Sequence, residues 1–225
     1  MTTLADLWPP AGLSLTCGDL VLTVPDTPTL VALGEVAGRG VHAEDAMPFL
    51  TPWTRGEPRD VARAVVTYNR GLHARMAADD WSLTLAVLRD GVPVGMQGIQ
   101  GKGFPMLREV ESGSWLGREF QGQGIGLRMR LMILHLAFDG FGADRALTSA
   151  FADNAASNAV SRRLGYAPNG EHWLAREGVP AKDLRYVLTR EAWEQRPDEH
   201  RLDVTYAGLD AVREFLQITD PRRPA

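Results

Sequence analysis

Cysteine is almost absent from this sequence. The chain of 225 residues holds one cysteine, Cys17, so neither an intramolecular disulfide nor a multi-cysteine metal site can form. No histidine lies near Cys17 in the sequence to stabilise a thiolate, and we interpret this cysteine as structural. No spacing of histidine, aspartate and glutamate resembles a set of metal ligands. The sequence therefore predicts no metal centre.

Long apolar runs are also missing. The richest one, Leu131–Phe138, is interrupted by His135 and is too short to cross a bilayer. The first residues, Met1–Asp6, lack the cationic segment and apolar run of a secretory signal. We therefore expect no association with a membrane and, by elimination, a cytoplasmic location.

Positive charge is not in excess. The chain has 24 lysines and arginines against 28 aspartates and glutamates, which gives a formal net charge of −4. A general nucleic-acid binder would show a basic stripe, so nucleic acid is not an expected partner. Hydrophobic residues make up 44% of the chain, an ordinary globular composition, and the length is sufficient for a substantial core.

Local patterns divide the chain into short strands and helices. Alternating residues predict strands, helical spacing of apolar residues predicts helices, and Asp90-Gly91 predicts a hairpin. The predicted strands cover a pair within 13–24, then 81–88, 92–100, 107–116, 145–151, the region of Trp173 and 184–188, and the predicted helices cover 29–37, 59–76, 123–139 and 154–164. This order predicts an α+β fold, with a mixed, mostly antiparallel central sheet flanked by helices.

The end of the chain departs from this rhythm. We expect one domain over 1–195 and a C-terminal appendage over 196–225, with a short strand at 203–206 and a short helix at 209–218. The appendage is expected to pack on the domain or on a partner subunit, so a homo-oligomer is one possible assembly.

The segment Trp115–Leu127 carries the clearest chemical signal. A strand, a glycine-rich turn and the start of a helix follow one another. The first turn of a helix has unpaired N–H groups and a partial positive charge, so it can hold a phosphate without a cationic side chain. Glycines at 122, 124 and 126 allow positive φ and a close approach of the ligand to the backbone.

Three phosphate-binding patterns compete for this segment. A Walker loop requires lysine followed by serine or threonine where the chain has Gln123-Gly124, and the dinucleotide fingerprint requires a glycine where it has Leu127. Both fail. The remaining pattern, Q/R-x-x-G-x-G/A, is matched by Gln121, Gly124 and Gly126.

A second motif follows at the right distance. It consists of Asn154, Ser157 and the pair Gly165-Tyr166. Together the two motifs resemble the GNAT-type acyl-CoA N-acyltransferases, and in particular their RimJ/RimL-like branch. The resemblance covers about residues 13–190 and implies the GNAT fold.

The resemblance implies acetyl-CoA or another acyl-CoA as co-substrate and a small-molecule amine or a protein N-terminus as acceptor. In the family, both bind together and the amine attacks directly, without an acyl-enzyme. The strand would splay from its neighbour to bond the pantetheine arm, the glycine segment would hold the diphosphate, and the second motif would line the thiol side. The implied cofactor-binding residues are Leu116, Gly117, Gln121, Gly122, Gln123, Gly124, Ile125, Gly126, Leu127, Asn154, Ser157 and Asn158.

Two residues are the candidate catalysts. Ser157 matches the serine proposed as partner of the departing thiolate, although a serine at a helix N-terminus also commonly bonds the backbone. Glu111 shares a strand face with Gly113 and Trp115 and is the candidate base, with a solvated or paired strand glutamate as the alternative. Glu109 lies on the same face of the strand as Glu111 and is the second candidate for the base.

Departures from the family pattern leave the donor and the turnover open. Close relatives use a glutamate at a slot that falls on Arg176, with Glu177 beside it. An arginine near the acyl pocket would hold the carboxylate of a succinyl-type donor in place of a plain acetyl group, and the alternative is a surface arginine in a strand turn. The apolar loop 47–53 is a candidate acceptor wall or part of the core. The rival function is an acyl-CoA-binding regulatory module without turnover.

Overall fold

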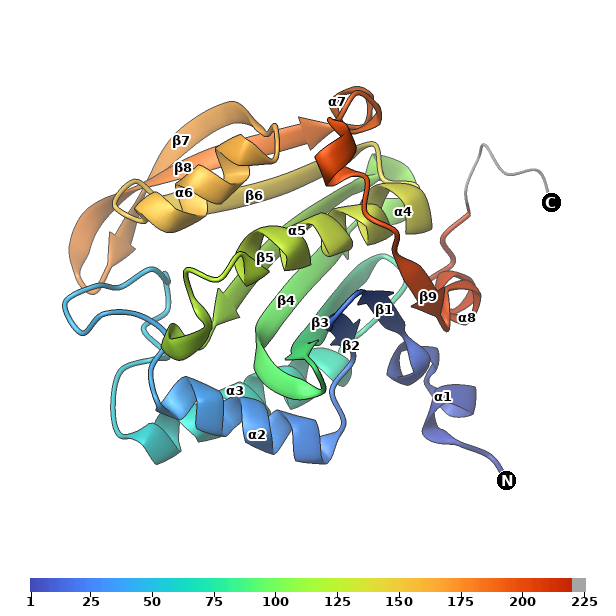
Figure 1. The fold of residues 1–225 in the computed structure, drawn as a ribbon, viewed down its shortest axis with the longest axis horizontal. Coiled ribbons are helices and arrows are strands. Elements are labelled where there is room, and N and C mark those ends of the chain that lie inside the picture. The colour runs from blue at the N-terminus through green and yellow to red at the C-terminus, as the bar shows by residue number, and fades with distance from the viewer. Residues whose placement is uncertain (220–225) are drawn as a thin grey trace.

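A single sheet runs through the molecule. The computed structural model describes residues 1–219, and within them nine strands form one sheet in the order β7-β8-β6-β5-β4-β3-β2-β1-β9 (Figure 1). The strands are β1 Ser14–Cys17, β2 Leu20–Thr23, β3 Asp80–Arg89, β4 Val92–Lys102, β5 Glu109–Leu116, β6 Arg145–Phe151, β7 Ala167–Arg176, β8 Val179–Thr189 and β9 Thr205–Ala207. Neighbouring strands are antiparallel except for β5 and β6, which are parallel. The predicted mixed, mostly antiparallel sheet is confirmed.

Helices cover both faces of this sheet. The helices are α1 Leu4–Leu7, α2 Thr27–Gly38, α3 Pro58–His73, α4 Phe104–Leu107, α5 Ile125–His135, α6 Ala155–Arg163, α7 Arg190–Glu194 and α8 Leu209–Phe215. Alternation along β3 separates the two faces, because Leu85 and Val87 lie in the core with α5 whereas Ala86 packs with α2 and α3. In Figure 1, α5 and α6 lie in front of the sheet.

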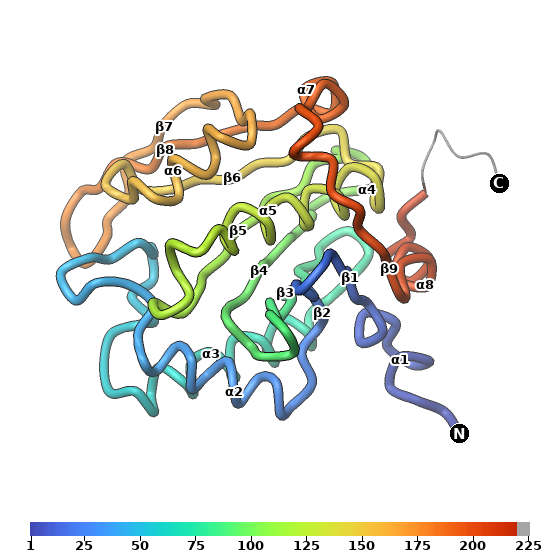
Figure 2. Tube along the Cα trace, viewed as in Figure 1, coloured from blue at the N-terminus to red at the C-terminus, as the bar shows by residue number. Residues whose placement is uncertain are grey.

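The C-terminal segment joins the sheet. Strand β9 pairs antiparallel with β1, with Ser14 opposite Ala207, and Val212 and Leu216 of the following segment are fully buried. Figure 2 shows the first and last parts of the described chain side by side at this edge. Within residues 196–219, β9 therefore extends the domain's own sheet, and the rest of the predicted appendage, 220–225, lies outside the described residues.

Helix α5 differs from its predicted bounds of 123–139. It begins at Ile125 because Gly124 has a φ of 76°, a left-handed conformation that an α-helix cannot include. After His135 it continues as one π-helical turn, Leu136–Gly140. The helix is buried around most of its circumference, as its composition predicts.

Candidate active site

Strands β5 and β6 separate along their length. Their parallel pairing is confined to Glu109–Glu111 and Arg145–Leu147, although β5 continues to Leu116. The Gly117 N–H, at the end of β5, donates to Val94 O of β4. Because the N–H and C=O groups of successive residues point to opposite sides of a strand, those of the even-numbered residues of β5 point toward β6. The separation leaves main-chain groups of β5 facing a gap, as the predicted splay requires.

A buried polar cluster marks the point where the strands part. The Thr148 hydroxyl of β6 donates to Ser112 O of β5 at 3.0 Å and accepts from Arg130 Nη1 at 3.1 Å. Arg130 is 4% exposed and makes no ion pair within residues 1–219. Burial raises the pKa of Tyr166 beside this cluster, against the influence of Arg130, so the phenol stays neutral. The cluster fixes the last contact between the two strands.

The glycine loop at the end of β5 is open. Gly122 and Gly124 have φ values of 72° and 76°, and a Cβ added at either would meet no atom within 4 Å. No side chain caps α5, whose first turn contains no acidic residue. The N–H groups of Ile125–Leu127 therefore have no partner within the helix, and an open helix start of this kind can bind an anion.

Three residues predicted to bind the cofactor also brace this loop. Gln121 Nε2 donates to Val41 O at 2.6 Å and to Leu116 O at 2.9 Å. Gln123 Nε2 donates to Glu119 O at 2.9 Å. A Cβ on Gly117 would come within 2.6 Å of Val36 Cγ1 on α2, so this glycine is required by packing. Contacts with a diphosphate would come from the main chain of the loop.

The second motif builds the start of α6. Asn154 Oδ1 accepts from the Ser157 N–H at 3.1 Å and caps the helix. Asn158 is 2% exposed, and its amide bonds Phe151 O, Asn154 O and the Tyr186 hydroxyl, each at 2.9 Å. The Asn158 side chain therefore braces the start of α6, and its contact with the pantetheine arm stays a prediction.

Ser157 retains a usable hydroxyl. Its main-chain groups are engaged, the N–H by Asn154 and the carbonyl by the Ser161 hydroxyl. Its half-buried side-chain oxygen makes no hydrogen bond within the described residues. The hydroxyl therefore does not bond the backbone, as the hydroxyl of a serine at a helix N-terminus commonly does.

A cavity of about 610 Å³ lies on the α3 face of the sheet. It is bounded by α3, by β3, β4 and β5, by Ser149 of β6 and by the loop 49–53. Glu111 is the one charged residue among its described lining, and Glu111 Oε2 accepts from Gln100 Nε2 at 3.2 Å. Because both β5 and β6 contribute, the cavity reaches the gap between these strands.

Aromatic rings form one wall of the cavity. The ring centroids of Phe49 and Trp53 lie 5.1 Å apart, and those of Trp53 and Trp115 lie 5.7 Å apart. The loop 47–53, which the sequence left open as acceptor wall or core, supplies two of these rings. Phe49 and Trp53 also pack against the α2–α3 cluster, so the loop both lines the cavity and belongs to the core.

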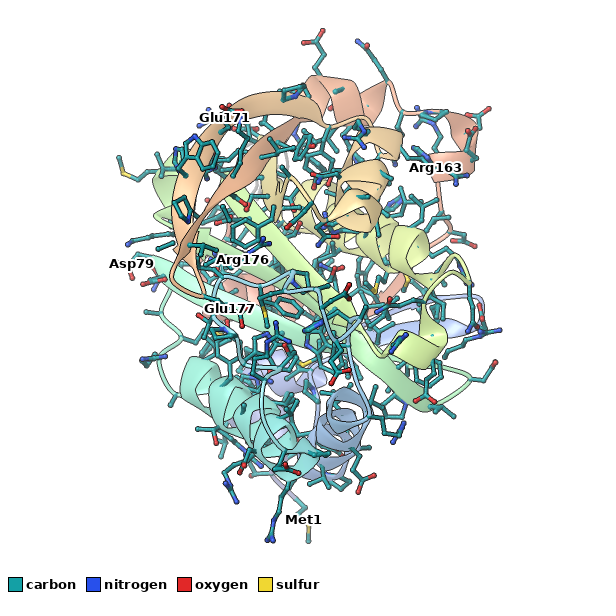
Figure 3. The ribbon with its side chains drawn as sticks, turned by 90° about the vertical axis from the view of Figure 1, so that its left-hand side faces the viewer. Met1, Asp79, Arg163, Glu171, Arg176 and Glu177 are labelled. Carbon is teal, nitrogen blue, oxygen red and sulfur yellow. The ribbon has the colours of Figure 1, made fainter. Side chains whose placement is uncertain are left out.

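The β7–β8 hairpin is tied to the same loop. Figure 3 shows Arg176 and Glu177 at the tip of this hairpin. Arg176 Nη1 donates to Asp153 Oδ1 and to Met47 O, both at 2.9 Å. Glu177 pairs with Arg55 at 2.9 Å, and the hydrogen bond from Arg55 lowers the pKa of the Glu177 carboxyl. Neither hairpin residue lines the cavity.

Within 1–219, no three histidine, cysteine, aspartate or glutamate side chains are grouped as metal ligands would be. None of the helices in that range has the length and apolar character needed to traverse a bilayer.

Sequence reasoning missed two polar residues of the cavity. Asn69 is 1% exposed on α3, and Thr84 lies on β3; both line the cavity. A signal for Asn69 was present, because it continues the buried i, i+4 row of Val61 and Val65 and places an amide where the helix expects an apolar residue. Thr84 had no such signal, since threonine is common in strands.

Comparison with known proteins identifies the family. The model of the acetyltransferase (GNAT) domain matches residues 28–167, which is more than half of the chain. The chain belongs to the GNAT acetyltransferase family, as the two motifs indicate.

One relative in sequence and two solved structures illustrate what this chain is similar to. YdaF of Bacillus subtilis (strain 168), which carries the name of a ribosomal N-acetyltransferase, is 28% identical over 125 residues; these make up 53% of this chain and 66% of the relative. RimJ of Mycobacterium smegmatis, solved with CoA-disulfide, has a TM-score of 0.68 and 20% identity, covering 90% of this chain and 95% of RimJ. RimL, a ribosomal L7/L12 α-N-protein acetyltransferase solved with coenzyme A, has a TM-score of 0.62 and 23% identity, covering 78% of this chain and 96% of RimL. At these identities the structures establish the shared fold.

Proposed function

We propose that this protein is an N-acetyltransferase that moves an acetyl group from acetyl-CoA to a primary amine by direct attack in a ternary complex. The observation that carries the proposal is the gap between β5 and β6. At one end of the gap lies the open start of α5, where a Cβ on Gly126 would sit 3.8 Å from Leu116 Cδ1. At the other end lies the cavity, which Ser114 and Ser149 line from the two separated strands.

An acyl-CoA fits the groups present along this path. The uncapped amides of Ile125–Leu127 would hold the diphosphate, and the glycines at 122 and 124 leave the space it needs. The gap-facing main-chain groups of β5 would bond the pantetheine arm. When bound, acetyl-CoA supplies an acyl group activated as a thioester.

Two side chains, Glu111 in the cavity and Ser157 in the first turn of α6, would then serve proton transfer. Glu111 Oε1 is free of hydrogen bonds within the described residues, while Oε2 is held by Gln100, so the carboxylate is oriented to accept a proton from the acceptor amine. The Ser157 hydroxyl would donate toward the departing thiol sulfur. As the C–N bond forms and the C–S bond breaks, the amine proton passes to Glu111 and the thiolate leaves hydrogen-bonded to Ser157; Glu111 then loses its proton to solvent as the thiolate gains one.

The acetyl group suits this cavity better than a succinyl group. A succinyl carboxylate needs a cation, and no lysine, arginine or histidine is among the described residues that line the cavity. Arg176, the candidate partner, already bonds Asp153 and Met47 O and stacks on Phe151 with its guanidinium 4.4 Å from the ring centroid.

The acceptor is a primary amine, and the names of YdaF and RimL favour a protein N-terminus. Acceptors of the ribosomal kind would place the enzyme in the cytoplasm. A small amine-bearing molecule is the alternative acceptor that the cavity volume allows.

Release of the CoA thiol tests the proposal. We expect thiol release from acetyl-CoA in the presence of a suitable amine or N-terminal peptide, and much slower release from succinyl-CoA. Binding of acetyl-CoA without thiol release across a broad amine panel would instead favour the regulatory module. Absence of binding would overturn the assignment of the cofactor site.

A further inference from the structure

The floor of the cavity is a trough that two glycines open. Gly98 of β4 pairs with Thr84 of β3 on one side and with Gly113 of β5 on the other, so these three residues form one row across the strands. A Cβ on Gly113 would meet no atom within 4 Å. The row therefore runs as a groove from Thr84 to the β5 edge, where the gap opens.

The rows on either side give the trough opposite characters. On one side Met96 pairs with Trp115, beneath the aromatic wall. On the other side Gln100 pairs with Glu111 and with Ser82. A ligand in the trough thus has an apolar flank and a polar flank that carries one negative charge.

The end of the trough farthest from the gap holds two unused polar atoms. Asn69 Nδ2 donates to Val65 O at 2.7 Å and approaches Met96 Sδ at 3.5 Å, which assigns the other amide atom as the oxygen. That Oδ1 and the Thr84 hydroxyl are buried without a hydrogen-bond partner. Unpaired buried polar atoms are costly, so two of them in one cavity wall indicate a ligand group that pairs with them.

The geometry points to an acceptor class: a primary amine on an extended apolar body that carries a second hydrogen-bond donor for Asn69 Oδ1 and Thr84 Oγ1, and no carboxylate. This inference rests on the proposed function. The trough crosses two strand spacings, so the two nitrogens, or nitrogen and hydroxyl, would lie about 10 Å apart. The single charge of the lining, Glu111, favours a cationic ligand and repels an anionic one.

A series of straight-chain amines tests this class. Acetyl transfer from acetyl-CoA would be measured for α,ω-diamines of increasing length, for monoamines of matched length and for the matching ω-amino acids. We expect kcat/KM to peak for the diamine that spans about 10 Å and to fall roughly tenfold or more for its monoamine and further for its amino acid. N-terminal peptides with and without a donor at that reach form the second arm, which distinguishes a protein source from a free amine.

Two variants connect the preference to the unused atoms. Asn69→Leu and Thr84→Val should reduce kcat/KM for the best diamine or peptide about tenfold while leaving its monoamine or donor-free counterpart unchanged. Thr67→Val, on the exposed side of the same helix, is the matched control and should change neither. Thr84→Val keeps the side-chain shape, so it serves if Asn69→Leu does not fold.

The outcomes distinguish failure of the acceptor class from failure of the proposed acetyltransferase function. Efficient acetyl transfer with no preference for a distal donor, or an equal loss for all amines in both variants, would overturn the acceptor class and leave the acetyltransferase intact. No transfer to any amine, together with tight acetyl-CoA binding, would overturn the proposed function itself.

Discussion

The two ends of the gap between β5 and β6 present different kinds of group to a ligand. At the α5 end these are main-chain amides of one continuous segment, Gly122–Leu127. The side-chain amides of Gln121 and Gln123 donate to carbonyl groups of the protein itself. On the α3 side, the cavity that the gap opens into presents side chains from a helix, several strands and a loop, among them Asn69, Thr84 and Glu111. The first arrangement suits a constant ligand, because any sequence supplies main-chain amides. The second suits a ligand that differs between relatives, because side chains change without altering the fold.

The largest effect is expected from a substitution in the glycine loop, at the main-chain end of the gap. Gly124→Val should abolish acetyl-CoA binding and turnover, because a β-branched residue is strained at a φ of 76° and its side chain would fill the open cradle. In the wild type, acetyl-CoA at a hundredfold excess over its Kd should stabilise the fold by about 2.7 kcal/mol, and the variant should show no shift in Tm.

A matched variant controls for strain in this test. Gly170→Val on β7 places valine at another positive φ, 89°, also with no atom within 4 Å of the added Cβ. It should retain the Tm shift with acetyl-CoA. If both variants bind acetyl-CoA as the wild type does, the glycine loop is not the diphosphate site.

Glu111→Gln should give the next largest effect, at the side-chain end. Removing the proposed base should lower kcat roughly 10²- to 10⁴-fold and leave the Kd of acetyl-CoA unchanged. Glu109→Gln is the matched control on the same strand, because Glu109 pairs with Arg145 at 3.1 Å and lies outside the cavity. Equal losses in the two variants would remove Glu111 as the base.

Ser157→Ala should act more mildly. A hydrogen bond to a charged sulfur is expected to contribute roughly 10- to 100-fold in kcat, and the cap of α6 is retained because Asn154 bonds the main chain of this residue. Steady-state kinetics should show the loss in kcat with little change in KM for acetyl-CoA. An unchanged kcat would return Ser157 to a purely structural role.

The smallest expected effect concerns the hairpin tip. Glu177→Gln breaks the ion pair with Arg55, which is exposed to solvent and screened, so KM for the acceptor should rise by less than about fivefold. Asp60→Asn, in the exposed pair with Arg63 at the start of α3, is a comparable change elsewhere and should leave KM unaltered. A larger rise would mean that the hairpin closes the cavity.

The difference between the main-chain end of the gap and its side-chain end also explains which parts of the site could be predicted from the sequence. The cradle is local, so Gly122, Gly124 and the order of strand, turn and helix predicted it from consecutive residues. The separation of β5 from β6 followed from the family resemblance that these motifs carry, whereas the mostly antiparallel sheet followed from the order of the predicted elements. By contrast, Gln121 and Asn158 were expected beside the ligand, and only the folded chain shows their amides bonded to carbonyls elsewhere.

The acceptor end could not be assembled from the sequence in this way. Thr84, Gly98 and Gly113 become one row only through the pairing of β3, β4 and β5. The buried cluster around Arg130 likewise depends on Thr148 and Ser112, which come together where two strands part. Such groupings depend on register and packing, which local patterns do not encode.

Initial-rate kinetics with both substrates varied test the central claim, that donor and acceptor meet in the gap from opposite ends. Direct attack in a ternary complex predicts intersecting lines in double-reciprocal plots of rate against acetyl-CoA at several amine concentrations. Parallel lines, together with an acetylated protein isolated in the absence of amine, would indicate a covalent intermediate and contradict the account.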